Sequence, residues 1–243
     1  MRAALERGRR IYAIGDVHGC VDLLEALLQE IRGDLKGWHG DTLLLFLGDY
    51  VDRGDNPAAI VERLRLGIGP DDLGCDCRLV CLKGNHEDLF MRAFESSRSL
   101  AVWLANGGGE TCRSYGIDVD LMMKRGKLYA CLPRALRELV PKAHRSFLAR
   151  LPLYYTAGDY YFCHAGVRPG IGLGEQAEED LLWIRDAFLH SERDHGKVVV
   201  HGHTPAWEPE LQANRIGIDT GAVYGGQLTA LVLEEDRRRF LQV

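Results

Sequence analysis

Three short apolar runs occur in the first half of the chain, and each ends in a polar turn that contains glycine. The runs are residues 11–14, 43–47 and 79–82, and the turns that follow them are 15–19, 48–54 and 84–87. Uninterrupted apolar runs of this length predict buried strands. Helical spacing follows each turn; Val21 to Ile31, for example, places its apolar residues at 23, 24, 27, 28 and 31. The pattern therefore predicts a strand, a turn and a helix, three times over.

The second half of the chain contains mostly strand patterns. We expect strands at residues 153–155, 160–163, 197–200, 215–219, 227–233 and 237–242. Ala157 to Asp159 reads as a hairpin turn, and Glu178 to Leu189 reads as one helix. Strands that alternate with helices first, followed mostly by strands, predict two packed sheets with helices outside them, in the α/β class.

Residues 96–150 differ from the rest because they contain no strand pattern. They include three consecutive glycines at 107–109, and Pro133 and Pro141 are expected to open short helices at 134–140 and 142–151. We expect a helical insertion or cap on a single domain of residues 1–243, shaping access to the site. A small separate domain is the alternative.

Length and composition are those of an ordinary globular protein. The 243 residues suffice for one α/β domain or at most two small ones. Apolar residues make up 46% and charged residues 27%, and the net charge of −5 gives no overall basic field. We therefore expect neither nucleic acid nor a membrane surface as a partner. The composition gives no oligomeric state.

A cytoplasmic location is expected from two further features. The first apolar run ends at Asp16, too soon for a secretion signal, and no run approaches the ~20 apolar residues of a membrane span. The seven cysteines are scattered and odd in number, which favours reduced thiols. Cys75, Cys77 and Cys81 lie close together but lack the paired spacing of a structural zinc site.

Metal-binding residue types follow the predicted strands. Asp16 and His18, Asp49, Asn85, His164 and the histidines of 201–203 each come after an apolar run. Ligands of α/β sheets bind at the carboxyl ends of the strands, so these turns are expected to meet. Carboxylate, amide and imidazole groups suit hard divalent cations, and two such ions can hold the attacking and leaving oxygens of a phosphoryl displacement. Any one of these residues alone is more often structural, but the repetition favours a two-metal phosphate site. By chemistry alone, His201 and His203 are equivalent candidates.

A set of five motifs gives the chain a family resemblance. They are Gly-Asp-x-His-Gly at 15–19, Gly-Asp-x-Val-Asp-Arg-Gly at 48–54, Gly-Asn-His-Glu at 84–87, His-Ala-Gly at 164–166 and Gly-His-Thr-Pro at 202–205. The chain resembles the phosphoprotein phosphatases, metal-dependent serine/threonine phosphatases within the calcineurin-like metallophosphoesterases, and in particular their bacterial and phage branch. The resemblance implies a sandwich of two mixed β-sheets flanked by helices.

The resemblance also implies which residues bind metal. One ion would be held by Asp16, His18 and Asp49, and the other by Asp49, Asn85, His164 and His203. Asp49 would then bridge the two ions, and the Gly-His-Thr context selects His203 over His201. The cofactors implied are two divalent ions, with Mn²⁺ preferred and Fe, Zn or Mg as alternatives.

The remaining motif residues are implied to act on the substrate. His86 matches the general acid of the family and Asp52 the carboxylate that orients it. Arg53 and Arg185 match phosphate clamps, and Tyr224 is expected to flank the substrate. The expected mechanism is direct attack of a metal-bridging hydroxide on phosphorus, with His86 protonating the leaving oxygen.

The expected function is dephosphorylation of phosphoserine and phosphothreonine, with phosphotyrosine as a further substrate, so the expected partner is a phosphoprotein or phosphopeptide. A symmetrical dinucleoside-polyphosphate hydrolase is the first alternative; the Asp52-Arg53-Gly54 run and Glu87 favour the phosphatase. A catalytically silent phosphate-binding module is the second alternative. It predicts a missing ligand or a missing His86, and the sequence retains all of them.

Overall fold

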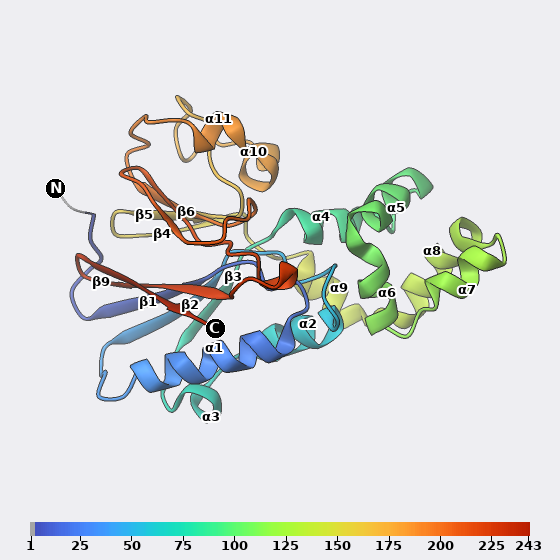
Figure 1. The fold of residues 1–243 in the computed structure, drawn as a ribbon, viewed down its shortest axis with the longest axis horizontal. Helices are drawn as coiled ribbons and strands as arrows, with labels where there is room; N and C mark the ends of the chain where they lie inside the picture. Colours follow the sequence, from blue (N-terminus) through green and yellow to red (C-terminus); the bar gives the residue numbers. More distant parts are fainter. Residues whose placement is uncertain (1–2) are drawn as a thin grey trace.

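Two five-stranded β-sheets lie face to face in the computed structural model, which describes residues 3–243, and helices cover their outer sides (Figure 1). The strand order is β10-β9-β1-β2-β3 in the first sheet and β4-β5-β6-β8-β7 in the second. Each sheet contains both parallel and antiparallel pairs. The expected α/β sandwich of two mixed sheets is confirmed.

The strands of the first sheet come from both ends of the chain. They are β1 (Arg9–Ile14), β2 (Asp41–Phe46), β3 (Arg78–Cys81), β9 (Thr229–Glu234) and β10 (Arg237–Gln242). The second sheet contains β4 (Tyr154–Ala157), β5 (Tyr160–Cys163), β6 (Val198–His201), β7 (Glu210–Leu211) and β8 (Arg215–Gly217). The short strand β7 is not predicted by the sequence pattern, because two residues show no periodicity.

Buried strands place side chains in two different cores. In β1, Ile11 and Ala13 pack between the two sheets, whereas Tyr12 and Ile14 pack under the helices on the outer face. Successive side chains of a strand point to opposite faces, so a strand covered on both sides must be apolar throughout. This explains why the first runs of the sequence are uninterrupted.

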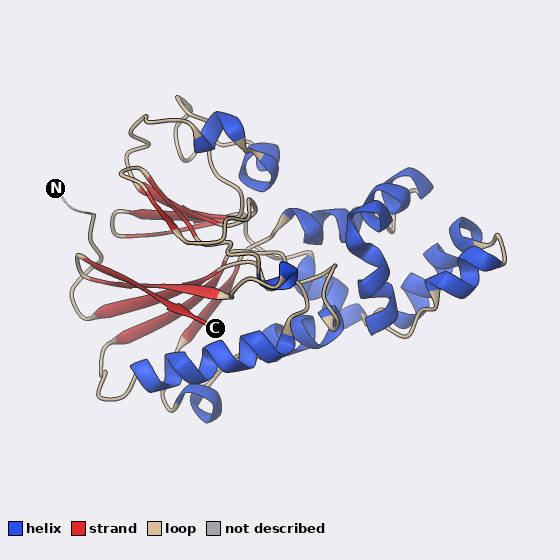
Figure 2. Cartoon of the chain, viewed as in Figure 1, coloured by secondary structure: helices blue, strands red, loops and turns tan. Residues whose placement is uncertain are grey.

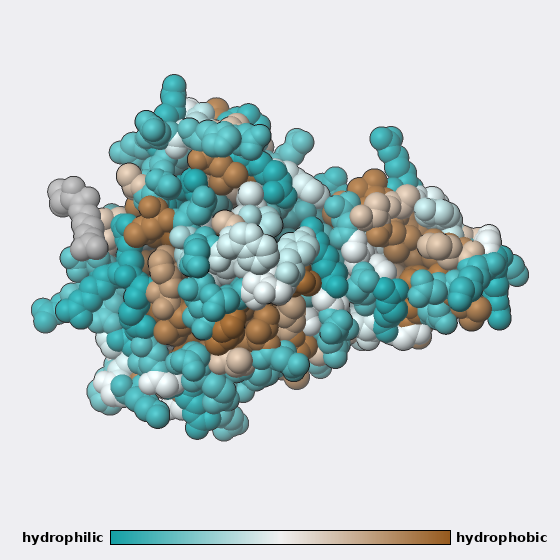
Figure 3. All heavy atoms as spheres, viewed as in Figure 1, coloured by the Kyte–Doolittle hydropathy of each residue, from teal (hydrophilic) through white to brown (hydrophobic). Residues whose placement is uncertain are grey.

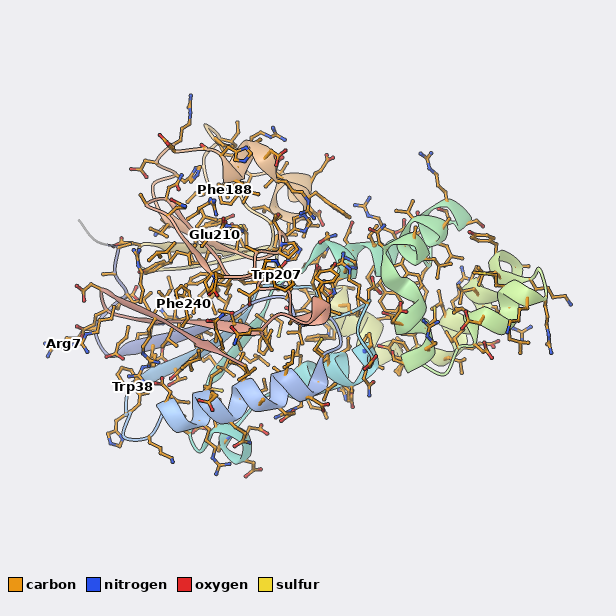
Figure 4. All side chains as sticks on the ribbon, viewed as in Figure 1. Arg7, Trp38, Phe188, Trp207, Glu210 and Phe240 are labelled. Atoms are coloured by element: carbon orange, nitrogen blue, oxygen red, sulfur yellow. The ribbon has the colours of Figure 1, made fainter. Side chains whose placement is uncertain are left out.

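Helices connect most of the parallel strands and cover the outer faces (Figure 2). On the first sheet these are α1 (Val21–Asp34), α2 (Pro57–Leu66), α3 (Pro70–Leu73) and α4 (Asn85–Arg92). Helix α3 is a single short turn that Pro70 opens. Helices α10 (Glu178–Trp183) and α11 (Asp186–Leu189) cover the second sheet, and Phe188 packs against it (Figure 4).

The prediction of one continuous helix from Glu178 to Leu189 is wrong. The backbone is extended at Ile184 and non-helical at Arg185, which has φ −131° and ψ −104°. Ile184 is buried in the same cluster as Phe188, so the chain bends here to keep both side chains against the sheet. Arg185 therefore lies at the break and not on a helix face.

Residues 97–148 form helices, most of which extend away from the sheets, while the last one returns to pack near α2 and α4 (Figure 1). They are α5 (Ser97–Trp103), the π-helical turn η1 (Leu104–Gly108), α6 (Gly109–Ser114), α7 (Val119–Lys124), α8 (Leu128–Leu139) and α9 (Lys142–Leu148). The expectation that Pro133 opens a helix is wrong: α8 begins at Leu128 and contains Pro133 in its interior, because the buried stripe Leu128, Leu132 and Leu136 runs through it. The single-domain division stays a prediction.

Apolar side chains are exposed on this helical part. Val102, Leu121, Met123, Tyr129 and Leu139 are each at least 40% exposed, and brown surface is visible there in Figure 3. Between residues 3 and 243, no helix has the length and apolarity needed to cross a membrane.

Candidate metal centre and active site

The polar turns that follow β1, β2, β3, β5 and β6 converge at one edge of the two sheets. They bring together the predicted metal ligands, and every one of these side chains is buried: Asp16, His18, Asp49, Asn85, His164 and His203. Their convergence follows from topology, because parallel neighbours end at the same edge.

Asp49 and His18 form one group of possible metal ligands together with His86. His18 Nε2 lies 3.4 Å from Asp49 Oδ2, and His86 Nε2 lies 4.0 Å from the same oxygen. His18 Nδ1 is 2.8 Å from the carbonyl oxygen of Val51 and can donate to it, so the lone pair is on Nε2, where it accepts an N–H of Arg53.

Asp16 lies beside this group without being one of its members. Its carboxylate oxygens accept the backbone N–H of His203, the shorter distance being 3.1 Å to Oδ2. Burial and the nearby carboxylates of Asp219 and Asp49 raise its pKa well above the usual range. A cation at this place would offset both effects, so the position is compatible with the predicted role.

Asp49 also belongs to a second group, with His164 and His203. His164 Nε2 lies 3.5 Å from Asp49 Oδ1 and 2.8 Å from Asn85 Oδ1, and His203 Nδ1 lies 3.0 Å from the same amide oxygen. His164 Nδ1 is 3.1 Å from the Leu47 carbonyl and donates to it, and burial lowers the pKa of His164 to about 3. The ring is therefore neutral.

The second group fits a cation by the chemistry of its atoms. With its proton on Nδ1, His164 presents a lone pair to an amide oxygen that is itself an acceptor. Two acceptors at 2.8 Å repel each other unless a cation lies between them. Neutral imidazole, amide and carboxylate are ligands that divalent ions accept. The shared Asp49 places the two groups next to each other.

His203, and not His201, belongs to the metal group. His201 Nδ1 lies 3.1 Å from the carbonyl oxygen of Gly202, and its ring packs edge-on against Phe188 at 5.0 Å. The choice of His203 from its Gly-His-Thr context stays a prediction, with which this geometry is compatible. Cys75, Cys77 and Cys81 have free thiols and form no such group in the part of the chain that the structure describes.

The turns reach this geometry through unusual backbone conformations. Positive φ is found at His18 (43°), Asp49 (55°), Asp52 (71°), Arg53 (68°) and His203 (66°). Left-handed conformations of non-glycine residues are strained and persist only where surrounding contacts hold them. Glycine is needed beside them: a Cβ on Gly84 would lie 2.2 Å from Asp49 Oδ1.

Glu87 is the contact that holds the second turn to the third. Its carboxylate accepts the backbone N–H groups of Asp49, Tyr50, Val51 and Gly84 at 2.8, 2.8, 3.2 and 2.9 Å. Glu87 is fully buried. The fourth residue of Gly-Asn-His-Glu therefore fixes the backbone that carries Asp49.

His86 and Asp52 form a buried pair beside the metal groups. His86 Nδ1 lies 2.7 Å from Asp52 Oδ2, so Nε2 faces the centre. The Asp52 carboxylate also accepts the indole N–H of Trp103 and the hydroxyl of Thr111. Trp103 and Thr111 were not predicted from the sequence, because nothing in the pattern of 96–150 marks them as site residues.

Arg53, Arg185 and Tyr224 lie at the exposed side of the centre. Arg53 Nη1 donates to His18 Nε2 at 2.7 Å, and its guanidinium carbon lies 5.6 Å from the centroid of the Tyr224 ring. Arg185 Nη1 donates to the hydroxyl of Thr204 at 3.1 Å.

A cavity of about 260 Å³ adjoins this cluster. It is lined by Pro205, Ala206, Trp207, Gly221 and Tyr224. Trp207 (labelled in Figure 4) is 73% exposed. The lining is aromatic and apolar, and the cavity shares Tyr224 with the Arg53 contact.

The model of the family described as calcineurin-like phosphoesterase matches residues 9–227. The chain belongs to this family. The match includes every motif turn described above, and the resemblance inferred from the motifs is confirmed. This membership makes the protein a phosphoesterase, with candidate His and Asp metal ligands in the turns at the strand ends.

Curated relatives of this phosphoesterase carry two different names. A protein of Salmonella typhimurium (strain LT2) named serine/threonine-protein phosphatase 1 is 30% identical over 241 residues, with 94% of each chain covered. A protein of Bacillus thuringiensis (strain Al Hakam) named bis(5'-nucleosyl)-tetraphosphatase PrpE [asymmetrical] is 26% identical over 239 residues, covering 90% of this chain and 88% of the relative.

Solved structures confirm the fold of the phosphoesterase. A crystal structure of a putative diadenosine tetraphosphatase has a TM-score of 0.62 and 21% identity, and covers 99% of this chain and 98% of that one. The cold-active protein-tyrosine phosphatase of a psychrophilic Shewanella has a TM-score of 0.61 and 16% identity, covering 99% and 82%.

Proposed function

We propose that this phosphoesterase is a metal-dependent phosphomonoesterase that removes phosphate from phosphoserine and phosphothreonine in cytoplasmic proteins, and from phosphotyrosine as a further substrate. The observation that carries the proposal is the buried His86–Asp52 pair, 2.7 Å apart, beside the metal groups. A serine or threonine alkoxide is a poor leaving group, so its departure needs a proton from a positioned acid.

Each residue then has a defined task. Asp16, His18 and Asp49 would hold one divalent ion, and Asp49, Asn85, His164 and His203 would hold a second. We take both ions to be Mn²⁺ in preference to Fe, Zn or Mg; when bound, they lower the pKa of water and neutralise phosphate charge. Arg53 and Arg185 bind the phosphate oxygens. His86 Nε2 donates its proton to the leaving oxygen, while Asp52 holds Nδ1–H.

Removing the proposed acid tests the proposal. His86→Asn is expected to lower kcat on a phosphoserine peptide by about 10²–10⁴-fold, and on p-nitrophenyl phosphate by much less, because nitrophenolate leaves without a proton. Metal content, measured on the same samples, is expected to stay at the wild-type level. An equal loss on both substrates would instead make His86 a residue that positions the metals.

A dinucleoside-polyphosphate hydrolase is the second candidate. It is supported by the Bacillus relatives and by the aromatic cavity, because Trp207 and Tyr224 offer rings on which a base can stack. The relatives are named asymmetrical, whereas the sequence suggested a symmetrical hydrolase as the alternative. A nucleotide leaves through a phosphate group that ionises near pH 6, so it needs an acid less than an alkoxide does. The His86–Asp52 pair therefore favours the first candidate.

Parallel turnover of a phosphoserine peptide and diadenosine tetraphosphate separates the two candidates. The phosphatase proposal expects a higher kcat/KM on the peptide. If the dinucleotide is the better substrate, its products identify the reaction: ATP and AMP for asymmetrical cleavage, or two ADP for symmetrical cleavage.

A further inference from the structure

Thr111, on α6, makes two hydrogen bonds to Asp52. Its Oγ1 accepts the backbone N–H of Asp52 at 2.9 Å and lies 2.6 Å from Asp52 Oδ1. A carboxylate only accepts, so the hydroxyl proton must point to it. One side chain therefore holds both the backbone and the carboxylate of the same residue.

Trp103, at the end of α5, holds the carboxylate from a second direction. Its Nε1–H donates to Oδ1 at 2.9 Å and to Oδ2 at 3.0 Å. The indole is stacked on Phe90 of α4, with ring centroids 4.9 Å apart, and α4 is the helix that carries His86. Asp52, Trp103 and Thr111 are all fully buried.

The same segment also contacts Arg53. The carbonyl of Gly107 accepts the backbone N–H of Arg53 at 3.2 Å. Gly107 has φ 102°, and a Cβ there would lie 2.8 Å from Arg53 Cγ. A Cβ on Gly108 would lie 2.5 Å from the Trp103 ring. Gly107, in the π-helical turn η1, thus lets the segment approach Arg53 closely, and Gly108 leaves room for the Trp103 ring.

The contacts matter because Asp52 and Arg53 are consecutive non-glycine residues with positive φ, at 71° and 68°. A strained backbone of this kind persists only where surrounding groups bond to it, so those groups determine where its side chains point. The backbone N–H groups of both residues are bonded to residues 107–111, which lie outside every metal motif.

We propose that Thr111 and Trp103 are positioning residues for the general acid, acting on His86 through Asp52. The proposal rests on the function proposed above. The helical insertion then completes the proton-donating half of the site, whereas the strand-end turns supply the metal-binding half. A purely structural role for the same residues would stabilise the fold and leave the chemistry of the leaving group unchanged.

Isosteric variants test the proposal. Thr111→Val removes the hydroxyl at nearly constant volume, and Trp103→Phe removes the indole N–H while keeping a ring against Phe90. Each is expected to lower kcat on a phosphoserine peptide about 10-fold or more, within the range of general acid catalysis, and to affect p-nitrophenyl phosphate clearly less. Thr111→Ser keeps the hydroxyl and is expected to restore the wild-type ratio of the two rates.

Leu100→Ala is the matched control. Leu100 is fully buried in α5 and makes no polar contact with Asp52, so this variant is expected to lower the melting temperature and leave the ratio of the two rates unchanged. The proposal is overturned if Thr111→Val and Trp103→Phe behave like Leu100→Ala, or if Thr111→Ser fails to restore the ratio. If Thr111→Val does not fold, Trp103→Phe decides by the same criterion.

A failure of the positioning role can be distinguished from a failure of the proposed function. If the wild-type protein does not hydrolyse phosphopeptides, the proposed substrate class is wrong. The ratio is then measured with phenyl phosphate, whose phenol has a pKa of about 10, against p-nitrophenyl phosphate. A selective loss on phenyl phosphate in Thr111→Val would uphold the positioning role without the protein substrate.

Discussion

Arg53 occupies a position that links the metal centre to the outer cavity. Its guanidinium donates to His18 Nε2 and lies over Tyr224, so it faces both the metal ligands and the exposed side. A planar guanidinium binds two phosphate oxygens at once, and more strongly as charge develops on them.

Arg53→Ala is therefore expected to raise KM and to lower kcat together, because the contact exists in the ground state and strengthens in the transition state. Inhibition by inorganic phosphate is expected to weaken in parallel. Steady-state kinetics with and without phosphate measure both effects. Unchanged phosphate inhibition in the variant would remove Arg53 from the phosphate site.

The metal ligands predicted from the sequence share one property: each follows an apolar run. The end of a buried strand has a fixed place in an α/β fold, so Asp49 or Asn85 can be located without coordinates. Trp103 and Thr111 could not be located, because their bonds to Asp52 span 51 and 59 residues and depend on how helices dock. Glu87 was recognised in its motif, but its four backbone contacts were not.

At the scale of elements, helix α8 shows how packing overrides local propensity. Proline in a helix interior removes one hydrogen bond and clashes with the preceding turn. Pro133 is nevertheless inside α8, since Leu128, Leu132 and Leu136 bury one face of the helix on both sides of it. Likewise, the break at Arg185 between α10 and α11 is set by tertiary burial, which an amphipathic pattern does not reveal.

Pro133→Ala is expected to raise the free energy of unfolding by about 2 kcal/mol. Removing proline relieves a helix penalty of ~3 kcal/mol. It also gives the unfolded chain more conformational entropy, which offsets up to ~1 kcal/mol of that gain. Urea denaturation measures the change. Pro141→Ala is the matched control, because Pro141 precedes α9 with φ −56° and fits proline without strain. A similar gain in both variants would contradict the explanation.

At the scale of the whole molecule, the metal centre joins the two sheets. Asp16 and Asp49 follow strands of the first sheet, and His164 and His203 follow strands of the second. Ligands that bind only the folded state stabilise it, by about 2.7 kcal/mol at a concentration of 100 Kd. Metal bound here would therefore stabilise the contact between the sheets as well as the turns.

Removal of metal by a chelator is expected to lower the melting temperature, and added Mn²⁺ to restore it. Asp49→Asn is expected to abolish turnover, to release metal and to lose this metal-dependent shift, because one carboxylate serves both groups. Metal analysis and circular dichroism establish whether the fold is retained. A variant that kept two metals and a near-normal rate would contradict the shared role of Asp49.

The positive φ angles at His18, Asp49, Asp52, Arg53 and His203 have a consequence for how this chain can change over evolution. Each such residue lowers the free energy of unfolding by on the order of 1 kcal/mol or more. The total for a folded domain is only about 5–15 kcal/mol, so the site takes up a large part of it. Substitutions to glycine in these turns would relieve strain while removing function. Selection for stability alone would therefore replace the site residues first. Substitutions that improve the site depend on stabilising substitutions elsewhere, such as in the helices of 97–148.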